Sequence, residues 1–295
     1  MEFFSDPSAF LEAAGDRLAA DPVVSTVVTT VADREVRRRA SGDETAYPHA
    51  PHWYAVARDE AGEVTGIAMR TATGAPYPLF VLEMRAEDAR ELARHCYGRG
   101  EIAPANGVLP AAREFCDELS RLAGGRVEVK EHTRLFELGD LVPPESAPEG
   151  WLRLARRDEA ELCLDWFNRF HTDAAEQAGH PGTHSMTQEF DLDDMLGRID
   201  EERVWLWEHP AHGVVHLTGA NPPAFGVSRI GPVFTPKTHR GKGYASAAVA
   251  EVSRQILEGG ARACLFTDQA NPTSNKIYEA LGYRPVVDMA NHDLL

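Results

Sequence analysis

The sequence predicts an α/β protein of the α+β kind, in which two domains each contain a mixed, mostly antiparallel sheet flanked by helices. The chain has 295 residues, which is enough for two domains of ordinary size. A polar, proline-rich segment at 142–150 predicts a linker. Runs with strand periodicity and runs with helical periodicity occur on both sides of it. We therefore expect a first domain at 1–141 and a second at 151–295.

The first half contains a mixture of helix and strand patterns. A helix is expected at 8–20, with Ser8 as its N-cap. Alternating apolar and polar residues predict strands at 52–58 and 64–70, and a further strand is expected at 79–84. The remaining expected elements are a helix after Gly107-Val108-Leu109-Pro110, with Ala112, Phe115, Cys116, Leu119 and Leu122 on one face, and strands within 127–138.

The second half has a clearer order. The first expected elements are a strand at 151–155, helices at 159–170 and 187–199 separated by a loop, and hairpin strands at 204–208 and 214–218. An apolar run at 231–236 then predicts a strand, and Pro232 marks a bulge or an edge because it cannot donate a ladder hydrogen bond. A last helix is expected to begin with Asn271 as N-cap and Pro272 in its first turn, and to stop at Gly282.

A glycine-rich turn, Arg240-Gly241-Lys242-Gly243-Tyr244-Ala245, separates the strand at 231–236 from an amphipathic helix. Glycines allow the backbone to approach a ligand closely, and the first N–H groups of a helix favour an anion. The turn therefore predicts a phosphate site. A dinucleotide fingerprint would need a third glycine, and a P-loop would need Ser or Thr after Gly-Lys, so neither of these nucleotide sites is supported.

The pattern Arg-x-x-Gly-x-Ala resembles the acyl-CoA pyrophosphate loop of the GCN5-related N-acetyltransferases, the GNAT superfamily. Two neighbouring segments extend this resemblance over 151–295. Val233-Phe234-Thr235-Pro236 is similar to the fourth strand of that family, and Leu265-Phe266-Thr267-Asp268 is similar to its fifth strand. Asn271-Pro272-Thr273-Ser274-Asn275-Lys276-Ile277-Tyr278-Glu279-Ala280-Leu281-Gly282-Tyr283 is similar to the segment that runs along CoA.

The resemblance implies acetyl-CoA as co-substrate and a direct transfer of its acetyl group to an amine. It implies that the cofactor is bound by Val233, Thr235, Arg240, Gly241, Lys242, Gly243, Tyr244, Ala245, Ser246, Asn271 and Asn275. Within this set, the loop residues would hold the pyrophosphate, and Asn271 and Asn275 would meet the pantetheine amides. Backbone N–H groups near Val233 would stabilise the oxyanion. The end of the helix at 159–170 would wall the acceptor site, with His171 and Asp173 facing it.

Direct transfer needs a base for the amine and an acid for the departing thiolate. The resemblance implies that Tyr278 is the general acid. The strand segment before Gly231 carries no acidic residue, so the general base stays open among Glu208, His216, Asp268 and His292. We expect no metal site, because the cysteines are scattered and no Cys-x-x-Cys pair occurs.

The first half resembles a degenerate GNAT domain. Gly107-Val108-Leu109-Pro110 is expected to take the place of Gly231-Pro232-Val233-Phe234, and the residues after it contain no glycine loop. Glu114 there would repel a phosphate. We therefore expect the first half to be non-catalytic and to support the second.

Composition limits the partners. The formal net charge is −16, which argues against a nucleic-acid partner. Scattered cysteines, together with the lack of a long apolar run or a signal-like N-terminus, predict a cytoplasmic protein without a membrane partner. A small-molecule amine is the expected acceptor, and the sequence leaves a homodimer open. The leading function is an acetyl-CoA-dependent N-acetyltransferase for a small or amino-acid-like amine, and the alternative is a non-catalytic acyl-CoA-binding sensor or scaffold. A transferase for longer acyl groups also stays open, since it depends on the depth of the pocket beside Val233 and Leu265.

Overall fold

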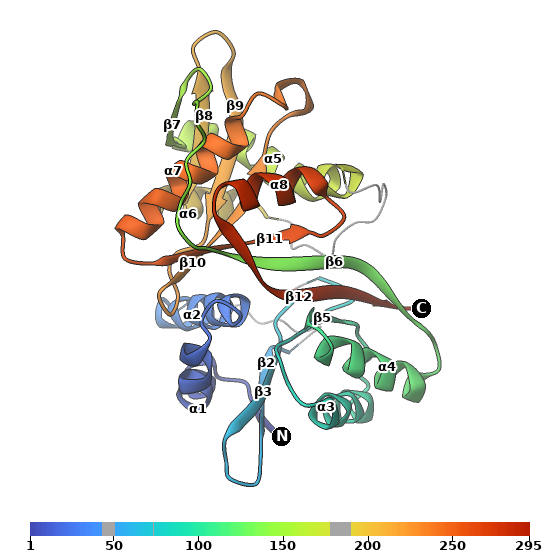
Figure 1. Ribbon diagram of the computed structural model, residues 1–295. Coiled ribbons are helices and arrows are strands. Elements are labelled where there is room, and N and C mark those ends of the chain that lie inside the picture. Colours follow the sequence, from blue (N-terminus) through green and yellow to red (C-terminus); the bar gives the residue numbers. More distant parts are fainter. Residues whose placement is uncertain (43–50, 73, 178–189) are drawn as a thin grey trace. The chain divides into compact units, whose positions relative to one another are not determined.

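The computed structural model describes residues 1–42, 51–72, 74–177 and 190–295 (Figure 1). The chain forms two compact units. The first unit contains Met1–Arg134 and Val287–Leu295, and the second contains Leu135–Val286. Part of the expected loop after position 170 and the start of the helix expected at 187 lie outside the described residues.

The first unit has the order strand, two helices, three strands, helix, strand, helix, strand. Its elements are β1 (Glu2–Phe4), α1 (Pro7–Ala20), α2 (Thr26–Ala40), β2 (Trp53–Arg58), β3 (Val64–Arg70), β4 (Leu79–Val81), α3 (Ala86–Gly98), β5 (Ala105–Val108), α4 (Ala111–Ala123) and β6 (Val127–Leu138). Its strand order is β1-β2-β3-β4-β5-β12, and β4 and β5 run parallel. The N-cap of α1 is Asp6, whose carboxylate accepts the Ser8 N–H, so the assignment of Ser8 as N-cap was wrong.

The second unit repeats this order. Its elements are β7 (Trp151–Leu154), α5 (Ala160–Gln177), α6 (Leu192–Asp200), β8 (Val204–His209), β9 (Gly213–Ala220), β10 (Val227–Phe234), α7 (Tyr244–Glu258), β11 (Arg262–Asp268), α8 (Pro272–Ala280) and β12 (Tyr283–Leu294). Short 3₁₀ turns, η1 (Arg157–Glu159) and η2 (Lys237–His239), precede α5 and α7. The strand order is β11-β10-β9-β8-β7, and β10 and β11 run parallel.

The last strand of each repeat extends beyond its own unit. The end of β6, from Leu135, belongs to the second unit, and the end of β12, from Val287, belongs to the first. For this reason the units differ from the expected domains at 1–141 and 151–295. Residues 142–150 contain neither helix nor strand, as expected, but they lie inside the second unit.

The helix after the glycine-rich turn, α7, is held in place because its apolar face packs against β10 and β11. Val249 and Val252 of α7 are fully buried and pack in one cluster with Ile230 of β10 and Leu265 of β11. Burial of each such side chain contributes about 1.5–3 kcal/mol. This packing holds the N-terminus of α7 at the end of β10.

The two parallel strands separate where β10 bends. Their pairing is recorded from Val227 with Arg262 to Ile230 with Leu265. On the other side, the register of β10 with β9 shifts between Ile230 and Val233, which confirms the irregularity expected at Pro232. Beyond Ile230, backbone groups of β10 are therefore available on the side where β11 has ended its pairing.

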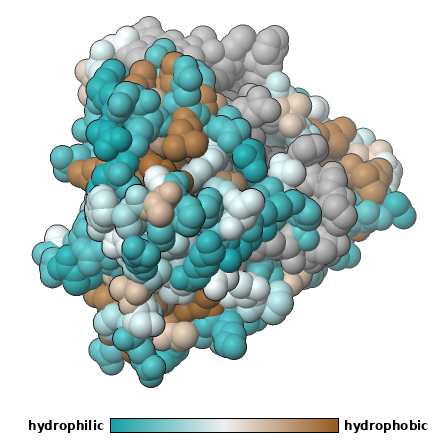
Figure 2. Space-filling model, turned by 90° about the horizontal axis from the view of Figure 1, so that it is seen from above, coloured by the Kyte–Doolittle hydropathy of each residue, from teal (hydrophilic) through white to brown (hydrophobic). Residues whose placement is uncertain are grey.

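On the coloured part of the face in Figure 2, hydrophilic side chains predominate and hydrophobic ones are interspersed, which is ordinary for a protein surface. None of the helices in the described part of the chain is long and apolar enough to cross a membrane.

Candidate active site

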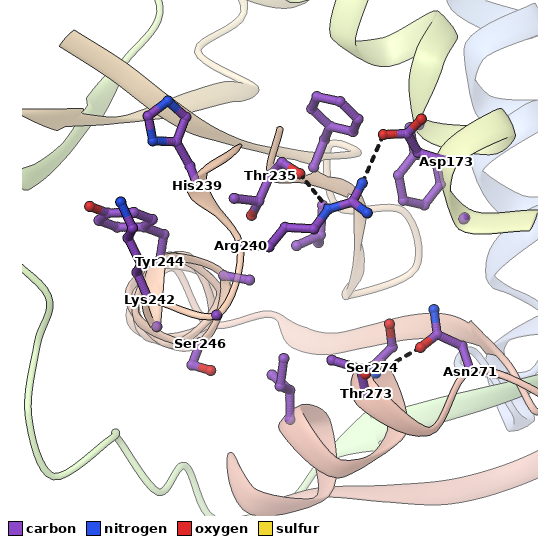
Figure 3. A pocket seen from close by; sticks show the side chains of 18 of the residues that line it. Asp173, Thr235, His239, Arg240, Lys242, Tyr244, Ser246, Asn271, Thr273 and Ser274 are labelled. Carbon is purple, nitrogen blue, oxygen red and sulfur yellow. Dashed lines mark hydrogen bonds and ion pairs between the residues drawn. The ribbon is translucent and has the colours of Figure 1, made fainter. Parts of the chain in front are cut away.

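A cavity opens in the second unit where β10, the glycine-rich turn, α5 and α8 meet (Figure 3). Its volume of about 290 Å³ is near the lower end of the range for small-molecule sites. Of the residues expected to bind the cofactor or to act as the general acid, all but Asn275 line it: Val233, Thr235, Arg240, Gly241, Lys242, Gly243, Tyr244, Ala245, Ser246, Asn271 and Tyr278. Segments that are separate in the sequence are thus brought to one place.

The turn has the backbone that a phosphate cradle requires. Gly241 has a φ of +74° and Gly243 a φ of +85°, both in the left-handed region that favours glycine. Gly243 is the N-cap of α7. The N–H groups of Tyr244, Ala245 and Ser246 are therefore in the first turn, where a helix supplies no acceptor of its own. This arrangement fits the pyrophosphate of an acyl-CoA.

Arg240 is directed toward α5 (Figure 3). Its Nε donates to the Thr235 carbonyl oxygen at 2.9 Å, and its Nη2 donates to Asp173 Oδ2 at 2.7 Å. Asp173 is only 8% exposed, and it is the one acidic residue among the described residues that line the cavity. Lys237 and Glu176 form a second ion pair between η2 and α5, at 2.5 Å. The guanidinium is thus partly neutralised before any ligand binds.

Lys242 differs from Arg240. It is exposed, it points to the opposite side of the turn in Figure 3, and it has no ion pair with any described residue. Its charge is therefore available to an anionic ligand. His239, which the sequence reasoning missed, also lines the cavity, and burial and nearby Lys242 lower its pKa. Its position directly before Arg240 was a signal that could have drawn attention to it.

Tyr278 lies on α8 and is 8% exposed. Burial raises the pKa of its phenol, so it stays protonated at neutral pH. No described residue forms a hydrogen bond with its hydroxyl group. Asn271 is the N-cap of α8, as expected, because its Oδ1 accepts the Ser274 N–H.

Asn275 does not line the cavity. Its Oδ1 accepts the Thr267 hydroxyl at 2.5 Å, and its Nδ2 donates to the carbonyl oxygens of Asp268 and Gln269. The hydrogen bonds of the Asn275 side chain therefore connect α8 to the end of β11. The expectation that it meets the pantetheine finds no support in this geometry. Thr273 and Ser274, from the same segment, line the cavity instead.

None of the four candidate bases lines the cavity. Glu208 is paired with Arg153, and Asp268 accepts the Ala270 N–H. His292 lies in the first unit, where its Nδ1 contacts the Ala105 carbonyl oxygen. His216 is fully buried, and burial lowers its pKa to about 3. The expected facing residue His171 has a side chain outside the described part, and among described residues no group of His, Cys, Asp and Glu could hold a metal ion.

The described residues of the first unit form no such cradle. Element order shows that β4 and α3 are the counterparts of β10 and α7, so the placement of Gly107–Pro110 opposite Gly231–Phe234 was wrong. The connection from β4 to α3 contains no glycine. At the start of α3, Asp88 is 6% exposed and accepts two hydrogen bonds from Arg85, which lower its pKa. A carboxylate thus occupies the first turn of α3, where a phosphate would need to bind.

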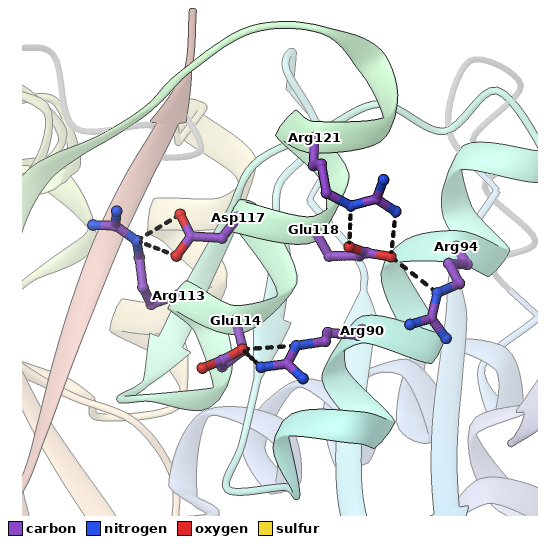
Figure 4. Close-up of polar contacts among 7 residues, drawn as sticks. All are labelled: Arg90, Arg94, Arg113, Glu114, Asp117, Glu118 and Arg121. Atoms are coloured by element: carbon purple, nitrogen blue, oxygen red, sulfur yellow. Dashed lines mark hydrogen bonds and ion pairs between the residues drawn. The ribbon is translucent and has the colours of Figure 1, made fainter.

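In the first unit, α3 and α4 are the counterparts of α7 and α8, and the space between them is also closed. Arg90 and Arg94 of α3 donate to Glu114 and Glu118 of α4 (Figure 4). Beneath these ion pairs, apolar side chains of both helices share one buried cluster, including Leu92 and Phe115. Glu114 is therefore part of a helix–helix contact and is not at a phosphate loop.

Comparisons with known proteins agree with this geometry. A family model described as FR47-like protein matches residues 224–290, which include β10, the turn, β11 and α8. No curated protein matches the sequence.

Solved structures share the fold over most or all of the chain. A Drosophila protein is 13% identical, covers 100% of this chain and 98% of its own, and has a TM-score of 0.65. A GCN5-related N-acetyltransferase from Sphaerobacter thermophilus is 17% identical, covers 99% and 95%, and has a TM-score of 0.58. The glucosamine N-acetyltransferase region of a fungal multi-domain β-N-acetylglucosaminidase is 11% identical, covers 82% and 33%, and has a TM-score of 0.51. The chain is thus similar to the FR47-like family in residues 224–290, and it shares the fold of GCN5-related N-acetyltransferase structures.

Proposed function

We propose that the second unit is an acyl-CoA-dependent N-acetyltransferase that moves an acetyl group from acetyl-CoA to the amine of a small or amino-acid-like molecule. One observation carries the proposal. The glycine-rich turn, with its free helix N–H groups, opens onto the same cavity as Val233 and Tyr278. A phosphate cradle, an unpaired strand edge and a protonated phenol are the parts that acyl transfer from CoA needs.

Each part has a chemical role in this proposal. N–H groups at the start of α7, with Lys242, bind the pyrophosphate. The edge of β10 near Val233 holds the pantetheine arm, and its N–H groups stabilise the oxyanion. The amine nitrogen attacks the thioester carbon and the C–S bond breaks. Tyr278 then donates its proton to the departing thiolate.

The four candidate bases named from the sequence do not line the cavity, so we propose another source of the base. Among the described residues, Asp173 is the acidic one that lines the cavity, and Arg240 holds it in an ion pair. We therefore expect water to remove the proton of the acceptor. In that case kcat/KM rises with pH as the acceptor amine loses its charge, until the amine is fully neutral.

A second function rests on the same observation. A cavity whose acidic residue is already paired also suits a non-catalytic acyl-CoA-binding sensor or scaffold. The two functions are distinguished by measuring free thiol released from acetyl-CoA in the presence of a panel of amines. Thiol release that depends on an amine supports the transferase. Binding of acetyl-CoA without release on any amine supports the sensor, and absence of binding overturns both.

We infer further that the first unit supports the second without binding cofactor. Its α3 N-terminus is occupied by Asp88, and α3 and α4 are joined by ion pairs. One molecule of CoA per chain, measured by calorimetry, is the expected stoichiometry. A cytoplasmic location and a homodimer remain proposals that fractionation and light scattering would test.

A further inference from the structure

A buried chain of hydrogen bonds leads from the sheet of the second unit to the cavity. His216 of β9 lies between two hydroxyl groups: its Nε2 is 2.7 Å from Thr218 Oγ1, and its Nδ1 is 2.8 Å from Thr235 Oγ1. His216 and Thr218 are fully buried, whereas Thr235 lines the cavity. The chain therefore ends at the place where a ligand would bind.

The direction of this chain follows from Thr218. Its hydroxyl hydrogen needs an acceptor, because a buried donor without one costs about 1–3 kcal/mol. Within the described part of the chain, His216 Nε2 is the acceptor that contacts this hydroxyl. Thr218 thus donates to Nε2. Burial lowers the pKa of His216 to about 3, so the ring is neutral and carries its one proton on Nδ1.

The same reasoning continues to Thr235. His216 Nδ1–H donates to Thr235 Oγ1, so the hydroxyl hydrogen of Thr235 is not used by the histidine. The carbonyl oxygen of Thr235 accepts from Arg240 Nε, but no described residue accepts the hydroxyl hydrogen. Thr235 therefore presents a hydrogen-bond donor whose free direction is the cavity.

We propose that the Thr235 hydroxyl donates to an amide carbonyl oxygen of the pantetheine arm of acyl-CoA, and that His216 is the positioning residue that fixes the direction of this donor. The inference rests on the proposed function. Thr235 follows β10 directly and precedes the phosphate-binding turn, so a ligand that extends from the turn along β10 passes it. An amide oxygen is the acceptor that such an arm offers.

The first experiment compares Thr235→Val, which removes the hydroxyl, with Thr235→Ser, which keeps it. Calorimetry measures binding of CoA and of 3′-phospho-ADP, which has the pyrophosphate but no pantetheine. We expect Thr235→Val to weaken CoA binding about tenfold and Thr235→Ser to weaken it by less than about threefold. Binding of 3′-phospho-ADP should not change. Equal losses for both ligands would show a phosphate acceptor and overturn the assignment.

The second experiment tests the action of His216 through Thr235. His216→Leu should weaken CoA binding about fivefold in the native background and have no further effect in the Thr235→Val background. Additive losses would overturn the positioning role. In the native protein, the ¹⁵N shifts of His216 should show a proton on Nδ1, and a proton on Nε2 would overturn the direction. This spectrum is recorded on the native protein without ligand. It therefore tests the position of the His216 proton even if CoA does not bind.

Discussion

The rings of Tyr278 and Tyr283 meet edge to face with centroids 6.0 Å apart, but their hydroxyl groups have different surroundings. Tyr283 is fully buried, and its Oη lies 2.7 Å from Ser253 Oγ. Tyr278 lines the cavity, and no described residue bonds its hydroxyl. The two tyrosines thus form a natural pair of test and control.

We predict that Tyr278→Phe lowers kcat about 100-fold, the range for loss of a general acid, with little change in the Kd for acetyl-CoA. Tyr283→Phe should leave kcat unchanged and lower the free energy of unfolding by about 1 kcal/mol, because it removes one internal hydrogen bond. Steady-state kinetics and urea unfolding of both variants check this. An unchanged rate for Tyr278→Phe would remove it as the acid.

The turn gives a second prediction. A Cβ at Gly243 would meet no neighbouring atom, so substitution acts through its φ of +85°. A β-branched residue is strained there by about 1–3 kcal/mol, and relaxing that strain moves the N–H groups of α7. Gly243→Val should weaken binding of CoA by about 5- to 150-fold in calorimetry. Gly197→Ala, inside α6 and equally free of neighbours, is the control and should bind normally. Binding of CoA by Gly243→Val at native affinity would contradict the assignment of the turn.

The pair of Arg240 and Asp173 gives a third prediction. Arg240→Ala would leave the largely buried Asp173 carboxylate unpaired beside a site for an anion, so CoA affinity should fall by more than about tenfold. Removing both charges, in Arg240→Ala with Asp173→Ala, should recover part of this affinity. A double variant that binds as weakly as Arg240→Ala would show that Asp173 has no influence. Calorimetry at constant ionic strength makes the comparison.

A fourth prediction concerns pH. The folded-state pKa of His216, about 3, lies below its ordinary value of 6.5. Between these values the unfolded chain binds a proton that the folded chain does not, so stability falls as pH decreases through this window. The loss is about 1.4 kcal/mol per pH unit below 6.5. Urea unfolding at pH 7 and pH 5 should show this loss in the native protein and a smaller one in His216→Leu. Equal losses of the free energy of unfolding in the two proteins would contradict the assignment of this loss to His216.

Local sequence was sufficient to predict the glycine-rich turn and the helix that follows it. Gly241 and Gly243 are needed because the backbone there is left-handed, and the apolar face of α7 follows directly. Asn271 was recognised as an N-cap for the same reason, since an N-cap depends on residues within one turn. These features are encoded by neighbours in the sequence.

Features that depend on packing were not predictable in this way. The repeat was aligned on the similar glycine and proline at Gly107–Pro110, although the strand pairing assigns that role to β4. Helix α2 begins with a run of Val and Thr that is more typical of a strand, and burial in the first unit overrides this preference. Arg240 was expected to face a phosphate, but its partner Asp173 is remote in sequence. Asn275 was expected to contact the ligand, but its amide is used to hold β11 and α8 together.

The first unit is built from two separate segments of the chain, and this affects how it folds during synthesis. It contains both Met1–Arg134 and Val287–Leu295, whereas the second unit is one continuous segment. A ribosome releases the chain from its N-terminus, and domains generally fold as units. Most of the first unit is therefore synthesised before the second unit but completes its fold after it. The reason is that β5 pairs with the segment that begins at Met289, which emerges only after the second unit.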